Sequence, residues 1–190
     1  MHFLLCLSAA ASTSASAFSI TAFVPSNSLD GAVIHASDSG FHSGLTKPTT
    51  YCSLHPASKC PKVAGTLVSE NMEHMAVSVP GGQQIYVQPD GQVQYTIPHS
   101  ADRPPGSIVG CWHRKTSTFS YNIPQAHDVL DFDDSRGHKG LALCPHTNST
   151  KGGTHMLYAR TKDFNVKSCV DVVGLTLTKS DANVGCWEYT

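Results

Sequence analysis

The chain has 190 residues and a formal net charge of −1, and only 14% of its residues are charged. Nucleic-acid-binding domains usually present a basic face, and no run of lysine and arginine occurs here, so the composition argues against a nucleic-acid partner. The length suits a single domain with a sizeable core.

The segment 1–17 is predicted to be a secretory signal peptide. Its apolar stretch, Phe3–Ala11, is followed by small residues that end in Ala15-Ser16-Ala17, the pattern of a cleavage site. The apolar stretch is far shorter than the roughly 20 residues that a membrane-spanning helix needs. We therefore expect a secreted chain that starts at Phe18 and has no membrane partner.

The segment 18–30 is polar and irregular, and we expect it to form a loose N-terminal arm. The segment 31–190 is expected to form one β domain. Strand-like alternation of apolar and polar residues recurs throughout it, and helical periodicity is nearly absent. The candidate strands are Val33–Ala36, Thr66–Ser69, Met75–Val79, Gln84–Gln88, Gln92–Ile97, Ser107–His113, Phe119–Ile123, Gly140–Cys144, His155–Arg160, Cys169–Thr178 and Val184–Tyr189.

The clearest of these elements is a hairpin over Gln83–Thr96. Two alternating strands flank Pro89-Asp90-Gly91, in which proline, aspartate and glycine each favour a tight turn. A second turn, Pro80-Gly81-Gly82, would let Met75–Val79 enter as the preceding strand of a three-stranded meander.

Many short strands separated by turns indicate an all-β domain. We predict a single-domain β-sandwich stapled by disulfides. A β-trefoil or a small barrel is the alternative, because repeated strand–glycine–strand units also suit those folds.

Six cysteines follow the predicted signal peptide: Cys52, Cys60, Cys111, Cys144, Cys169 and Cys186. An even number in an exported chain indicates disulfides, and six cysteines allow 15 pairings. A zinc site would favour closely paired ligands such as C-x₂-C, and none occurs. The histidines likewise lack the spacing of metal ligands, so we expect no metal or other cofactor.

The sequence contains none of the usual nucleophile motifs, and we expect no enzymatic activity, hence no catalytic residues. Four aromatic residues are candidates for carbohydrate contact, although aromatic residues on strands more often lie in the core: Tyr86, Tyr95, Trp112 and Trp187. Asn148-Ser149-Thr150 is a glycosylation sequon, which in an exported chain predicts an N-glycan on a surface loop.

The run from Val79 to Ser100, which reads PGGQQIYVQPDGQVQYTIPH between its ends, resembles the central signature of the PhiA family of fungal cell wall proteins, also known as IgE-binding proteins. Further segments are similar to that family in the same order along the chain: Ile34-His35, Gly40-Phe41, Thr50-Tyr51-Cys52, Cys60-Pro61, Pro104-Pro105-Gly106-Ser107, Leu143-Cys144-Pro145 and Trp187-Glu188-Tyr189-Thr190.

This resemblance implies a secreted, non-catalytic wall glycoprotein linked to the development of phialides and conidia. Wall polysaccharides or wall proteins would be its partners. Alternatives are a secreted carbohydrate-binding or effector-like protein and, less favoured, a small secreted hydrolase or ribonuclease.

The resemblance also implies a disulfide pairing. Four cysteines match the family, which implies Cys52–Cys60 and Cys144–Cys169. Cys111 and Cys186 depart from the family pattern, so we expect a third bridge, Cys111–Cys186.

Overall fold

The computed structural model describes residues 16–120, 124–146 and 153–190. Strands and a single turn of 3-10 helix, η1, are the regular elements in these ranges. In chain order the elements are β1 (Phe18–Phe23), β2 (Ile34–Ser37), β3 (Gly40–Ser43), β4 (Thr50–Tyr51), η1 (Ala57–Lys59), β5 (Ile85–Val87), β6 (Val93–Tyr95), β7 (Trp112–Ser120), β8 (Pro124–Phe132), β9 (Leu141–Pro145), β10 (His155–Ala159), β11 (Val170–Val172), β12 (Gly174–Lys179) and β13 (Glu188–Tyr189). The predicted all-β class is confirmed.

A four-stranded antiparallel sheet has the order β1-β12-β8-β7. All six residues of β1 pair with β12. The expectation of an irregular arm over 18–30 is therefore wrong for its first half. Ile20 and Ala22 are almost fully buried and alternate with Ser19 and Thr21, which is the two-residue period of a half-buried strand. The β domain thus begins at β1.

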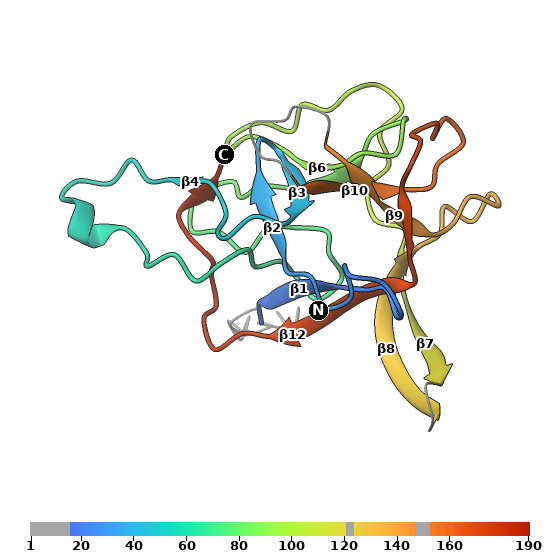
Figure 1. Ribbon diagram of the computed structural model, residues 1–190. Coiled ribbons are helices and arrows are strands. Elements are labelled where there is room, and N and C mark those ends of the chain that lie inside the picture. The colour runs from blue at the N-terminus through green and yellow to red at the C-terminus, as the bar shows by residue number, and fades with distance from the viewer. Residues whose placement is uncertain (1–15, 121–123, 147–152) are drawn as a thin grey trace, which may run out of the picture.

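A larger antiparallel sheet has the order β11-β9-β10-β3-β6-β5. Strand β2 also belongs to this sheet and pairs with β3, outside that order. A third, two-stranded sheet joins β13 to β4. Strands from distant parts of the chain therefore lie side by side, as β3 and β10 do in Figure 1.

The predicted hairpin is confirmed as β5 and β6. Its turn is closed by a hydrogen bond from the Gly91 amide to the Gln88 carbonyl, 2.9 Å long. Gly91 has a φ of +95°, and a Cβ built there would lie 2.2 Å from the Ala159 carbonyl oxygen. Both the backbone conformation and the close contact with β10 therefore require glycine.

The predicted preceding strand, Met75–Val79, does not continue the hairpin as a meander. An isolated bridge joins the residues just before the two segments, His74 and Gln84. Met75–Val79 then turns to the C-terminal segment, where the Ser78 amide donates to the Cys186 carbonyl over 3.1 Å. This pairing between distant residues removes the third strand from the sheet.

The two larger sheets share one core. Ile20 and Leu175 come from the four-stranded sheet, and Phe41 and Leu157 come from the larger sheet, and all four are fully buried in the same cluster. Figure 1 shows β1 and β12 lying across the molecule from β3, β6 and β10. This arrangement fits the predicted sandwich. Neither strand order closes on itself within the described residues, so the barrel alternative is wrong.

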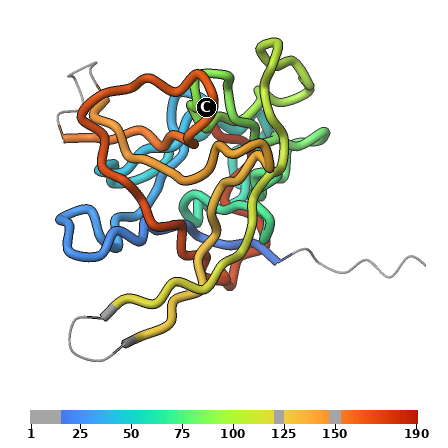
Figure 2. Tube along the Cα trace, turned by 90° about the vertical axis from the view of Figure 1, so that its right-hand side faces the viewer, coloured from blue at the N-terminus to red at the C-terminus, as the bar shows by residue number. Residues whose placement is uncertain are grey.

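The β7–β8 hairpin projects from this body (Figures 1 and 2). Its strands pair over nine positions, whereas β8 pairs with β12 at a single position, Leu130 with Leu175. The base of the hairpin is anchored in the core by Phe132, whose ring meets Trp112 edge-on at 5.8 Å.

Two of the three expected disulfides form, Cys52–Cys60 and Cys144–Cys169. The first closes a local exposed loop around η1. The second joins Cys144 in β9 to Cys169, the residue before β11. Strands β9 and β11 are also hydrogen-bonded neighbours. A covalent link between adjacent strands reinforces the edge of the larger sheet.

The expected Cys111–Cys186 bridge is wrong, because both residues are free thiols. Different neighbours hold the two residues. Cys186 is buried beside Tyr189 and pairs with Val77. Cys111 is half-buried at the start of β7, where its carbonyl accepts a hydrogen bond of 3.0 Å from the Asp133 amide.

Candidate functional site

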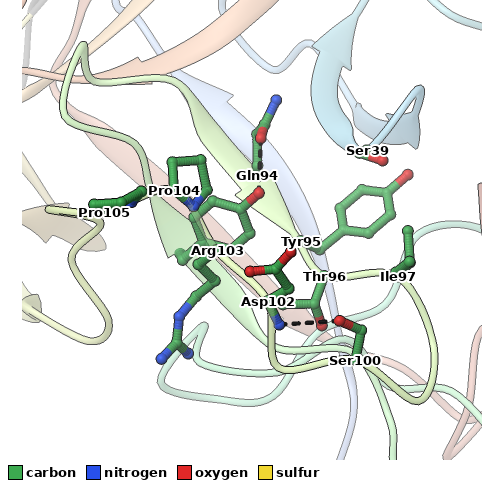
Figure 3. A pocket seen from close by; sticks show the side chains of 11 residues that line it. Ser39, Gln94, Tyr95, Thr96, Ile97, Ser100, Asp102, Arg103, Pro104 and Pro105 are labelled. Carbon is green, nitrogen blue, oxygen red and sulfur yellow. Dashed lines mark hydrogen bonds between the residues drawn. The ribbon is translucent and has the colours of Figure 1, made fainter.

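A pocket of about 600 Å³ lies beside the β5–β6 hairpin. Its lining comes from that hairpin and from the segment that follows it, up to Pro105, with Ser39 added from the turn before β3. In Figure 3 Gln94 and Ser100 lie on opposite sides of the pocket, and Asp102 lies between them. Pro104 and Pro105 lie at one end.

The hairpin contributes a polar face to this pocket. The Tyr86 hydroxyl donates a hydrogen bond of 2.8 Å to the Gln94 side-chain carbonyl, Oε1. The Gln88 amide nitrogen donates to the same oxygen. Two donors on one acceptor fix the plane of the Gln94 amide.

The opposite wall is an irregular segment held by its own hydrogen bonds. Thr96 anchors its start, since its amide donates to the Gln84 carbonyl and its hydroxyl accepts from the Gln84 amide, both over 2.9 Å. Further along, the Asp102 amide donates to the Ser100 hydroxyl oxygen over 3.0 Å. The Arg103 guanidinium donates to the Gln84 side-chain carbonyl. This last contact ties the segment back to the residue before β5.

Burial sets the protonation of Tyr86. Desolvation raises the pKa of its phenol, and this effect outweighs the opposing effects of the hydrogen bond to Gln88 and the charge of Arg103. The charge of Asp102 acts in the same direction as burial. The phenol therefore remains a neutral hydroxyl that donates to Gln94 at physiological pH.

Tyr95, a second candidate for carbohydrate contact, also lines the pocket but belongs mainly to the core. Its ring packs edge-on against Phe41 at 5.6 Å and against Tyr189 at 6.3 Å. Its hydroxyl donates to the Thr190 carbonyl over 3.2 Å. Only 2% of the residue is exposed, so its ring offers no open face to a ligand.

The structure does not bring all four aromatic candidates together. Trp112 and Trp187 lie outside the lining of this pocket, and both are partly buried. Trp112 packs against Phe132 at the base of the projecting hairpin.

Sequence reasoning missed the amide and charged residues of the pocket, Gln94, Asp102 and Arg103. A signal for Gln94 was present. The two-residue period of the hairpin strands places Gln84, Tyr86 and Gln88 on one face, and antiparallel pairing sets Tyr86 opposite Gln94. The irregular segment 97–105 has no periodicity, so the positions of Asp102 and Arg103 could not be predicted.

A separate charged pocket of about 440 Å³ lies at the base of the β7–β8 hairpin. The Lys115 ammonium forms an ion pair of 2.6 Å with the Asp131 carboxylate, and the His113 ring lies 3.2 Å from the Asp133 carbonyl oxygen. The charges of Lys115 and Asp131 therefore neutralise each other. Across the described ranges, no group of three or more histidine, cysteine or acidic side chains could hold a metal ion.

Asn148, the predicted glycosylation site, lies outside the described residues. Among the residues that are described, no helix has the length and apolar character needed to cross a membrane.

Comparison with known proteins places the chain in a family. No protein-family model matches it, and no solved structure matches it. It is 32% identical over 148 residues to an uncharacterised secreted protein of the fungus Arthroderma benhamiae, a match that covers 75% of this chain and 70% of the relative. The chain therefore belongs to the family of secreted fungal proteins represented by this relative.

Proposed function

We propose that this protein is a non-catalytic component of the fungal cell wall. Membership of a family of secreted fungal proteins supports an extracellular site of action. The resemblance of the segment Val79–Ser100 to PhiA-type wall proteins supports the wall in particular, and it suggests a role in the development of phialides and conidia.

One structural observation carries the proposal. The segments that resemble the wall proteins, Val79–Ser100 and Pro104–Ser107, supply eight of the eleven residues that line the pocket. The part of the sequence with the strongest likeness thus supplies most of the lining of this pocket.

Fractionation of a fungal culture tests this proposal. An epitope-tagged copy, expressed from its own promoter, is followed by immunoblot in the medium, in the detergent-extractable wall and in the covalently bound wall. We expect most of the protein in the two wall fractions during conidiation. Recovery of nearly all of it from the medium would contradict a wall function.

A second assay addresses the absence of catalysis. The purified protein is incubated with RNA, β-glucan and chitin, and products are measured over hours at several pH values. We expect no turnover above that of a heat-denatured sample. Reproducible hydrolysis of any of these polymers would contradict the proposal.

A further inference from the structure

The Gln94 side chain carries two hydrogen-bond donors that no described residue uses. Its Oε1 atom accepts from both the Tyr86 hydroxyl and the Gln88 amide nitrogen. The Nε2 atom makes no hydrogen bond with any residue in the described ranges. Because the amide plane is already fixed, this nitrogen is held in place before a ligand arrives, which lowers the entropy lost on binding.

The opposite wall offers an acceptor. The Asp102 carboxylate is exposed and forms no ion pair within the described part of the chain, and its own amide is held by Ser100. Figure 3 shows the Asp102 side chain between Gln94 and Ser100. A pocket lined by both donors and acceptors matches a ligand with many hydroxyl groups, since each hydroxyl both donates and accepts.

The charges of the pocket balance. Asp102 is its single carboxylate, and Arg103 is its single guanidinium, which already donates to Gln84. The two charges leave the pocket with no net charge, so it offers no net attraction to an ionic ligand, and a neutral ligand is the better match.

Apolar surface at the two ends completes the pocket. Ile97 is 64% exposed at one end, and Pro104 and Pro105 are exposed at the other. Sugar rings combine hydroxyl edges with apolar C–H faces, so they suit a pocket of alternating polar and apolar parts. The volume of about 600 Å³ lies within the range of small-ligand sites and accommodates a few sugar rings.

We propose that this pocket binds a neutral oligosaccharide segment of a polysaccharide, with Gln94 as donor, Asp102 as acceptor, and Ile97 and the two prolines against the ring faces. The inference rests on the proposed wall function and names the ligand class of the same site. It needs no chemical step, because binding alone retains the protein.

Isothermal titration calorimetry on the full secreted protein tests the inference. The probes are a β-1,3-linked glucohexaose, a chitohexaose and, as an anionic comparison, an oligogalacturonate. We expect saturable binding of at least one neutral hexaose and none of the anionic one. Absence of saturable binding to both neutral hexaoses, or binding of the anionic probe alone, would overturn the proposal.

Variants locate the binding to this pocket. Gln94→Ala and Asp102→Asn are each expected to weaken binding about tenfold, whereas the exposed controls Gln125→Ala and Asp163→Asn should bind as the unmodified protein does. Thermal unfolding identifies any misfolded variant. Ile97→Ser, at an exposed position, provides a change with little risk to folding and should also weaken binding. Unchanged affinity in all three folded pocket variants would refute the assignment.

The two proposals fail in different ways. Wall retention without oligosaccharide binding would remove this inference and leave the wall function intact. Oligosaccharide binding by a protein found only in the medium would support the pocket and contradict the wall function.

Discussion

The Gln83 side chain and the Tyr189 backbone form a reciprocal pair of hydrogen bonds. The Tyr189 amide donates to Gln83 Oε1 over 2.9 Å, and Gln83 Nε2 donates to the Tyr189 carbonyl over 3.0 Å. Both residues are 1% exposed. Gln83 Nε2 also donates to the Thr96 carbonyl over 2.9 Å. One buried side chain therefore joins the C-terminal strand to the hairpin that builds the pocket.

Replacement of Gln83 tests this link. Gln83→Ala leaves three buried backbone groups without partners, and we expect a loss of about 2–4 kcal/mol in the free energy of unfolding. Urea denaturation followed by tryptophan fluorescence measures it. Gln125→Ala, at an exposed position of β8, is the control and should change stability by less than about 0.5 kcal/mol. A loss that small in Gln83→Ala would show that the pair contributes little.

The two disulfides should differ in their contribution. Cys144–Cys169 spans 25 residues and Cys52–Cys60 spans 8, and a longer closed loop restricts the unfolded chain more. We expect the double serine variant of the first pair to lose about 3.5 kcal/mol and that of the second to lose about 2.5 kcal/mol. Chemical denaturation of both variants provides the comparison, and a reversed order would contradict it.

Because the Cys186 thiol is buried, we expect the free energy of unfolding to fall at alkaline pH. Burial raises its pKa from 9.0 to about 12, and burial also raises the pKa of the Tyr95 and Tyr189 phenols. The folded state thus favours the neutral forms. The stabilisation is complete below about pH 9 and is lost as the pH rises from 9 towards 12.

Denaturation at pH 8 and pH 10.5 measures this effect. The unmodified protein should be less stable at pH 10.5, and Cys186→Val should lose less stability between the two pH values. Cys111→Val, at the half-buried thiol, serves as the control. An equal loss in all three proteins would exclude Cys186 as a cause.

The sequon at Asn148 predicts a glycan on the secreted protein. Endoglycosidase treatment should lower the apparent mass of the unmodified protein and leave the Asn148→Gln variant unchanged. An unmodified protein that does not shift on treatment would contradict the prediction.

Local signals were sufficient for some elements of the fold. The hairpin β5–β6 was predictable because Asp90-Gly91 determines its turn and alternation determines its faces. The same reasoning failed for the segment 75–79, whose backbone partners lie near Cys186. Strand pairing across a hundred residues depends on core packing, which a single sequence does not display.

The pocket illustrates the same limit. Tyr86 and Tyr95 were both candidates for carbohydrate contact because aromatic residues on strands are recognisable, yet the structure buries both, with 7% and 2% of each residue exposed. Tyr95 is the more enclosed of the two, because its ring packs against Phe41 and Tyr189. Likewise, two unmatched cysteines did not imply a bridge, because the fold places them against different neighbours.

We propose that the pocket that Gln94 and Asp102 line retains this secreted protein at the wall. The most direct test is the distribution of the Gln94→Ala/Asp102→Asn double variant between wall and medium, in a strain that lacks the native copy. We expect the double variant to move from the wall to the medium, while the Gln125→Ala/Asp163→Asn control remains at the wall. A folded double variant that stays at the wall to the same extent as the control would contradict it.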